Sequence, residues 1–280
     1  MDLSRTAIMM TAWRRPQYLR QVLASWAKVD GVRDVAAFVV CLDASGRQDQ
    51  MINVIQTARR DHGLPIVVHL NQDQDGRPAQ FGVSINPVEG GTLVFREFPT
   101  VDYLVMAEED LIVADDTLRY LSWADETFRD NPEVLIACAH SPDNPDPEAD
   151  PAAVVLQRRF RCWIWATWRD RWFGTLEPTW DRAYYTGNVE TGQQAGFDWN
   201  IDLRVIHGHD PHTKGRKYLC ALPLASRSQN KGKFEGVHAD PTAYEGTLNP
   251  SFRETFGEVD YRLSGTEAAE PRIAGSAAHQ

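Results

Sequence analysis

Three carboxylates follow directly on an apolar run, and their spacing suits a cation. Residues 103–107 read as a strand buried on both faces, and Glu108, Glu109 and Asp110 come next. Ligands of open α/β sheets bind at the carboxyl ends of strands. Glu108 and Asp110 would point to one side of an extended chain, and such hard oxygen ligands suit Mg²⁺ or Mn²⁺ shared with substrate phosphates. A solvated acidic turn is the alternative interpretation.

A second acid closes another apolar run. Residues 36–42 end at Asp43, which is followed by Ala44, Ser45 and Gly46. A carboxylate there could accept hydrogen bonds from a nucleotide base or a ribose hydroxyl, and the small residues would permit close approach. The same pattern is also ordinary turn chemistry.

The loop 11–16 joins the first expected strand to the first expected helix. It contains Ala12, Arg14 and Arg15, which we take as candidate donor contacts. Arginine side chains can bind a diphosphate through forked, charge-assisted hydrogen bonds, although paired arginines are commonly just solvated.

An acid between two aromatic residues is the candidate general base. Asp198 lies between Phe197 and Trp199. Aromatic neighbours exclude water and can stack on a sugar, which would raise the basicity of the carboxylate. A surface turn is the alternative.

Residues 226–238 are polar, basic and punctuated by glycine. They include Ser226, Arg227 and His238, and they predict a mobile lid that orders over phosphates. A flexible loop without function is the competing interpretation.

The elements that must position these residues follow a βα alternation in the first half of the chain. We expect strands at 6–10, 36–42, 66–70, 103–107 and 134–139, and helices at 16–26, around 51–58 and after Asp116 as an N-cap. This predicts an α/β fold with a mixed, mostly parallel sheet flanked by helices. Residues 1–140 would be the nucleotide-sugar-binding half, residues 141–264 a less regular acceptor-binding and catalytic half of the same domain, and residues 265–280 a flexible tail.

Bulk properties restrict the function classes. The 280 residues suit one large domain, and the net charge of −10 argues against nucleic acid as a general partner. Four dispersed cysteines signal neither a zinc site nor a disulfide framework. The longest aliphatic run is too short to span a bilayer, so we expect a cytoplasmic protein without membrane insertion.

The five segments, in this order, resemble the GT-A glycosyltransferases. The resemblance is closest to the N-acetylglucosaminyltransferase I family, which transfers GlcNAc from UDP-GlcNAc to a mannose of N-glycans, and it covers roughly residues 8–238. The family's metal motif is an acidic triplet closing a strand of valines, as residues 105–110 are here. Two departures bear on the acceptor side: the family's membrane anchor and stem have no counterpart in this sequence, and the stretch 181–196 of this chain has no clear counterpart in the family.

The resemblance implies a role for each matching residue. Asp110 would bind the metal, with His238 as a further candidate ligand, while Glu108 would touch the donor sugar and Glu109 would lie by the ribose. The uracil-side acid falls on Asp43 and the first-loop arginine on Arg14 or Arg15. The base before a tryptophan falls on Asp198 with Trp199, and the donor-ordered loop begins at Ser226 and Arg227.

The implied reaction is an inverting, metal-dependent transfer from a nucleotide diphosphate sugar, favouring a UDP-sugar, to the hydroxyl of a glycan, protein or small molecule. A sugar-phosphate nucleotidyltransferase is one alternative, but the loop 11–16 lacks glycine. A non-catalytic carbohydrate-binding protein would explain the tryptophans without needing acids at strand ends. A hydrolase metal site in His207-Gly208-His209-Asp210-Pro211-His212 is disfavoured because the spacing is not helical.

Overall fold

One large mixed sheet organises the molecule. The computed structural model describes residues 1–143, 145–182, 196–235 and 244–267, and within them nine strands pair in the order β11-β7-β9-β6-β8-β4-β1-β2-β3. Their bounds are β1 Thr6–Ala12, β2 Ala37–Leu42, β3 Ile66–Leu70, β4 Tyr103–Glu108, β6 Val134–Cys138, β7 Ala153–Gln157, β8 Trp165–Trp168, β9 Leu219–Pro223 and β11 Arg262–Glu267. The predicted α/β fold with a mostly parallel sheet is confirmed.

The first half of the chain forms the parallel part of this sheet. Strands β4, β1, β2 and β3 are parallel neighbours, in a register that pairs Thr11 with both Cys41 and Glu108. Residues of β1, β2 and β4 are almost all buried, as expected for parallel strands covered on both faces. This register brings the ends of β1, β2 and β4, and therefore the loop at Arg14, Asp43 and the acids, to one edge.

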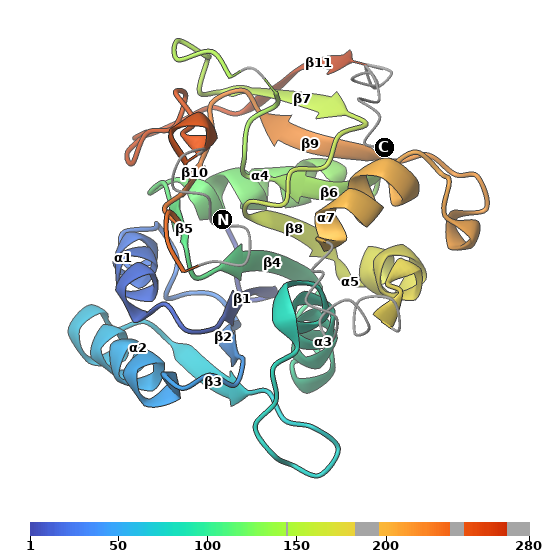
Figure 1. Ribbon diagram of the computed structural model, residues 1–280. Helices are drawn as coiled ribbons and strands as arrows, with labels where there is room; N and C mark the ends of the chain where they lie inside the picture. The colour runs from blue at the N-terminus through green and yellow to red at the C-terminus, as the bar shows by residue number, and fades with distance from the viewer. Residues whose placement is uncertain (144, 183–195, 236–243, 268–280) are drawn as a thin grey trace, which may run out of the picture.

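Helices cover both faces of the sheet (Figure 1). Helices α1 (Pro16–Trp26), α2 (Gln48–His62) and α4 (Thr117–Phe128) pack into one hydrophobic cluster, whereas α3 (Gly82–Glu97) packs into the other. Shorter helical turns lie in the second half: α5 Arg169–Arg171, η1 Trp172–Leu176, η2 Glu177–Thr179, α7 Phe197–Asn200, η3 Ile201–Val205, η4 Pro211–Thr213 and η5 Tyr244–Thr247.

Helix α3 is an element that the sequence pattern does not indicate. It contains Pro87 and the pair Gly90-Gly91, all unfavourable inside a helix. The glycines permit close packing, because a Cβ on Gly90 would come within 2.9 Å of the sulfurs of Met9 and Cys41, and one on Gly91 within 2.6 Å of Trp172. Tertiary packing overrides local propensity here.

The second half is more regular than the sequence predicts. Strands β7, β8, β9 and β11 complete the main sheet, where only loops over its edge were expected. Strand β8 lies antiparallel between β4 and β6. Strand β11 also extends through Glu267, so the expected tail cannot begin at residue 265. These strands are only four to six residues long, and β8 carries two tryptophans in place of an aliphatic run, so their local pattern is weak.

The segment that begins at Ser226 is anchored rather than mobile at its start. Strand β10 (Ser228–Asn230) pairs antiparallel with β5 (Leu111–Val113) directly after the acidic cluster. Arg227 is fully buried against Asp116, with 3.2 Å between Nη2 and Oδ2. The predicted lid over 226–238 is therefore wrong for residues 226–230. The Asp116 side chain makes no cap hydrogen bond at α4, because it is engaged by Arg227 and the Tyr261 hydroxyl.

All four cysteines are free thiols, as expected. Within the described residues, no helix is both long and apolar enough to cross a bilayer.

Candidate functional site

The acidic cluster sits in the turn between β4 and β5. Glu108 ends β4, and Glu109 and Asp110 are only 5% and 7% exposed. This burial argues against a solvated acidic turn, because three carboxylates withdrawn from water need compensating partners.

Arg15 is the partner that compensates two of these acids. It precedes the first residue of α1 and is itself 8% exposed. Its Nη2 lies 2.8 Å from Glu109 Oε1, and its Nη1 lies 2.9 Å from Asp110 Oδ2. Burial alone would lower the pKa of Arg15, but the charges of Glu109 and Asp110 raise it above its ordinary value. In this structure Arg15 therefore orients the acidic cluster, and its contact with a diphosphate stays a prediction.

One oxygen of the cluster has no partner among the described residues. Asp110 Oδ1 is buried and makes no hydrogen bond, while Oδ2 is held by Arg15. A buried carboxylate oxygen without a donor is costly unless a ligand completes it. Among the described residues, no group of three or more His, Cys, Asp or Glu side chains could hold a metal ion. A single carboxylate holds a hard cation only when other ligands, such as phosphates and water, complete the coordination. His238 lies outside the described residues.

Glu108 links the acidic cluster to the candidate base. Burial and the charges of Asp110 and Glu109 raise its pKa well above the usual range, and the charge of Asp198 adds to that rise. Burial likewise raises the pKa of the Cys162 thiol, again with contributions from Asp198 and Glu108. Asp198 and Glu108, 90 residues apart in sequence, thus lie within electrostatic range of one another, with Cys162 near both.

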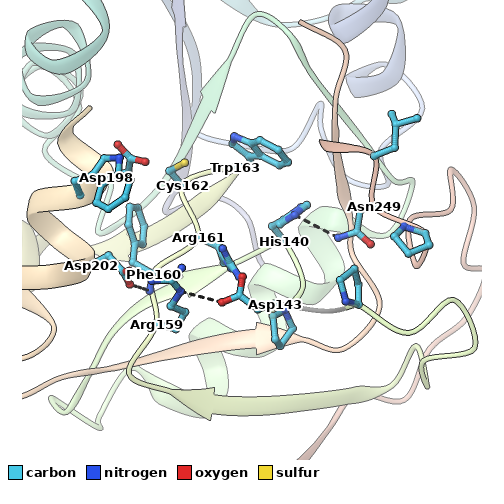
Figure 2. Close-up of a pocket in the computed structure, with 15 residues that line it drawn as sticks. His140, Asp143, Arg159, Phe160, Arg161, Cys162, Trp163, Asp198, Asp202 and Asn249 are labelled. Carbon is cyan, nitrogen blue, oxygen red and sulfur yellow. Dashed lines mark hydrogen bonds and ion pairs between the residues drawn. The ribbon is translucent and has the colours of Figure 1, made fainter. Parts of the chain in front are cut away.

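A pocket of about 580 Å³ opens beside Asp198. Figure 2 shows Asp198, Cys162 and Trp163 along one side and His140 and Asn249 toward the other end. The lining residues are His140, Pro142, Asp143, Pro145, Arg159, Phe160, Arg161, Cys162, Trp163, Asp198, Trp199, Asp202, Leu248, Asn249 and Pro250. Trp199 follows Asp198 in α7 and is 67% exposed, so a large aromatic surface stands next to the acid at the pocket wall.

The charged residues of the pocket wall are matched to one another. Arg159 Nε lies 3.2 Å from Asp143 Oδ2, and Arg159 also pairs with Asp202. Arg161 pairs with Asp143, and the backbone N–H of Phe160 donates to Asp202 at 2.6 Å. Because two arginines face two aspartates, the wall has no excess of positive charge with which to bind a polyanion.

Asp43 is bonded to the chain itself. It is 2% exposed, and its carboxylate accepts hydrogen bonds from Asn71 Nδ2 at 2.7 Å and from the backbone N–H groups of Phe81 and Gly82 at 2.9 and 2.8 Å. Burial raises its pKa, and these hydrogen bonds oppose the rise. In this structure Asp43 fixes the chain at the start of α3, and its contact with a nucleotide base stays a prediction.

Four other expected donor contacts are placed as follows. Ser226 and Arg227 are completely buried in this structure, and their contacts with a donor stay predictions. Ala12 is buried at the end of β1, where its carbonyl accepts from the N–H of Asp43 at 2.9 Å. Arg14 is exposed, and its guanidinium stacks over Trp13 with 4.0 Å to the ring centroid. Of the first-loop arginines, Arg14 is the one still accessible to a ligand.

The site also contains residues that the sequence did not single out. Arg47, in the loop after Asp43, lines a cavity together with Arg14 and Glu235 and contacts both residues. Arg159 and Arg161 lie in a loop between β7 and β8, far from any strand-end acid. Only the alternation of arginine with aromatic residues at 158–163 could have indicated a surface that recognises a ligand.

His140 is the centre of a buried polar network at the pocket end. Asn249 Nδ2 donates to its Nε2 at 3.3 Å, and its Nδ1 lies 3.0 Å from Ser226 Oγ and 3.3 Å from the Ser228 carbonyl. Burial, reinforced by the charge of Arg161, lowers the pKa of His140 to about 4. The imidazole is therefore neutral at pH 7, and it joins β10 to the segment around Asn249.

Because His140 is neutral in the folded protein, we expect the free energy of unfolding to fall at acidic pH. Below pH 6.5 the unfolded chain takes up a proton that folded His140 accepts only near pH 4, so the free energy of unfolding falls as pH drops through this window. We expect His140 to contribute a loss on the order of 2 kcal/mol between pH 7 and pH 5. Urea unfolding at both pH values measures it.

The matched variants are His140→Gln and His62→Gln, the second at an exposed position on α2. The free energy of unfolding of His140→Gln should lack the fall between pH 7 and pH 5 that His140 contributes, whereas His62→Gln should show the same fall as the wild type. An equal fall in stability for His140→Gln and the wild type would show that His140 is not the responsible group.

The histidines at 207–212 contact one another and Asp210 around η4. His207 and His209 stack with 6.1 Å between ring centroids, and His212 contacts Asp210, which caps η4. This arrangement agrees with an ordinary polar loop.

Comparisons with known proteins add a partial likeness in topology. No family model matches the chain, and no curated protein matches it. A mannosyltransferase from Pyrobaculum calidifontis, solved with GDP-Man and Mn²⁺, superposes with a TM-score of 0.44 at 14% identity, over 80% of this chain and 57% of that one. The S. aureus protein TarS (residues 1–349), solved with UDP-GlcNAc, gives 0.37 at 13% identity, over 53% and 38%. This chain thus spans little more than half of the first protein, and likeness of this degree identifies neither its donor nor its reaction.

Proposed function

We propose that the protein is a glycosyltransferase that moves a sugar from a nucleotide diphosphate sugar, with a UDP-sugar favoured, to an acceptor hydroxyl. One observation carries the proposal. A buried acidic cluster, in which one Asp110 oxygen has no partner among the described residues, lies within electrostatic range of Asp198, an acid on the wall of an open pocket. The two halves of a displacement reaction, leaving-group stabilisation and hydroxyl activation, need such neighbouring but separate sites.

The donor side of the site is built from the acidic cluster and the first loop. Asp110 would hold Mn²⁺ or Mg²⁺ through Oδ1, because Arg15 keeps Oδ2 in place. When bound, a divalent ion would stabilise the charge that develops on the departing diphosphate. Glu108, at the end of β4 and within electrostatic range of Asp198, would contact the transferred sugar, and Arg14 would supply an accessible positive charge.

The acceptor side is the pocket at Asp198. An acceptor hydroxyl entering past Trp199 would meet the Asp198 carboxylate, which removes its proton as the hydroxyl oxygen attacks the anomeric carbon. Attack from the side opposite to the diphosphate inverts that carbon and needs no covalent intermediate. The two wall arginines are paired with Asp143 and Asp202 while Asp198 adds a further acid, so this wall and the exposed indole favour a neutral acceptor with an apolar face, such as a glycan or glycoside, over nucleic acid.

Calorimetry with nucleotides tests the donor assignment directly. We expect UDP to bind in the presence of Mn²⁺ and to bind at least about tenfold more weakly after chelation, because its phosphates share the cation with Asp110. GDP and TDP are the matched probes for the base. Tight binding of GDP with none of UDP would overturn the preference for uridine, whereas no binding of any nucleotide would overturn the proposed function.

A further inference from the structure

A short strap crosses from the acidic cluster to the first loop. We define it as residues 231–235, directly after β10. The Lys231 N–H donates to the Asp110 carbonyl at 2.7 Å, and the Phe234 N–H donates to the Tyr18 hydroxyl at 3.0 Å. Gly232 lies so close to Asp110 that a Cβ there would collide with Oδ2. The strap therefore passes over the edge of the sheet at which the donor phosphates would lie.

The last residue of the strap places a carboxylate among positively charged and amide groups. Arg47 makes a forked contact with Glu235, with 3.0 Å from Nη1 to Oε2 and 3.3 Å from Nη2 to Oε1. Gln17 Nε2 donates to Oε2 at 3.2 Å, and Arg14 Nη2 lies 3.4 Å from the Glu235 carbonyl. Arg14, Gly46, Arg47 and Glu235 line a cavity of about 410 Å³.

The backbone of Glu235 is held in an uncommon conformation. Its φ of +59° lies in the left-handed region, which a residue with a Cβ seldom adopts. The contacts with Arg47 and Gln17 offset this strain. A forked guanidinium and an amide donor around two carboxylate oxygens are also the groups that recognise two phosphate oxygens.

We propose that Arg14, Arg47 and Gln17 form a phosphate-binding subsite for the donor diphosphate, and that the Glu235 carboxylate is an internal competitor for it. The inference rests on the proposed function, since it takes the donor to be a nucleotide diphosphate. A bound diphosphate needs positively charged partners. Arg15 already pairs with Glu109 and Asp110, so Arg14 and Arg47 would supply that charge. Of the subsite residues, Arg14 directly precedes Arg15 in the chain, whereas Arg47 comes from the loop after β2.

Displacing Glu235 is energetically easy. The side chains of Arg47 and Glu235 are 43% and 39% exposed, and ion pairs this open to water contribute little to stability. A diphosphate carries more charge than a carboxylate and can also reach the cation held by Asp110. It therefore competes well for Arg47, while Glu235 reduces its apparent affinity.

The test measures UDP binding with Mn²⁺ by calorimetry for Glu235→Gln, Arg47→Gln and the double variant. Glu235→Gln should bind UDP about 3- to 10-fold more tightly, and Arg47→Gln at least about tenfold more weakly. In the double variant the gain from Glu235→Gln should disappear. Glu254→Gln, which removes an equal charge from an exposed pair with Lys28, should leave the affinity unchanged.

Inorganic pyrophosphate and uridine separate the phosphate contribution from that of the nucleoside. Glu235→Gln should increase the affinity for pyrophosphate as it does the affinity for UDP, and UDP should displace bound pyrophosphate. The affinity for uridine should not change. If the wild type binds UDP and Glu235→Gln does not tighten it, the inference is overturned while the proposed function stands. If the wild type binds no nucleotide but pyrophosphate binding tightens in Glu235→Gln, the subsite stands without the proposed function. Binding of neither ligand to either protein overturns both.

Discussion

Asp110→Asn should lower the rate of sugar transfer by roughly 10³-fold, the upper range for removing one group that stabilises developing charge. Asparagine has the size of aspartate but lacks the charged oxygen that a cation needs, and Arg15 keeps its contact with Glu109. The strand that carries the cluster keeps its buried contacts, so the fold should be retained. Steady-state rates and Mn²⁺-dependent UDP binding, measured together, should fall together.

The control for this variant is Asp61→Asn, which removes the same charge from an exposed ion pair with Arg60 at the end of α2. Its rate should equal that of the wild type. If Asp110→Asn turned over normally with unchanged dependence on Mn²⁺, the acidic cluster would not be the metal site.

A second large effect is expected at the other acid. Asp198→Asn should reduce turnover by roughly 10²- to 10⁴-fold, the contribution of a positioned general base, while the affinity for UDP stays within a few-fold of the wild type. Turnover should fall while UDP affinity is retained because the base acts on the acceptor hydroxyl, in a pocket distinct from the acidic cluster. Rates with saturating donor and acceptor, alongside UDP calorimetry, test both halves of the statement.

Asp170→Asn is the matched control, because this residue is also acidic, lies in the second half of the chain and is exposed beside Arg171. Near-normal transfer by Asp198→Asn would place the base elsewhere. Asp202 would then be a weak replacement, since its carboxylate is held by Arg159 and by the N–H of Phe160.

The parallel half of the fold could be predicted because its signals are local and agree with one another. Pro16 begins α1 as expected for a first helical turn, and the aliphatic run at 103–107 forms β4. Helix α3 could not be predicted, because the reason for its Gly90-Gly91 pair is the packing against Met9, Cys41 and Trp172. The strands of the second half were missed for a related reason, since β8 is four residues long and rich in tryptophan.

The candidate site divides in the same way. That Glu109 and Asp110 lie at a strand end follows from the apolar run before them, whereas no local pattern indicates that the distant Asp198 lies within electrostatic range of Glu108. Asp43 ends a strand in the same manner, yet backbone N–H groups of a later helix use both its oxygens. Whether a strand-end acid binds a ligand or the chain itself depends on what packs above it, and a linear sequence does not encode that in a local pattern.

The place of β8 has a consequence for how the chain reaches its native state as it is synthesised. Strand β8 separates β4 from β6 in the sheet although it follows both in the sequence. Until residue 168 has left the ribosome, the open edge of β4 has no partner, and β6 has no neighbour on that side. An unpaired edge of a hydrophobic strand is a template for association with other chains. A nascent chain that stalls after β6 would therefore expose an aggregation-prone edge, and the regular first half depends on the tryptophan-rich second half to close it.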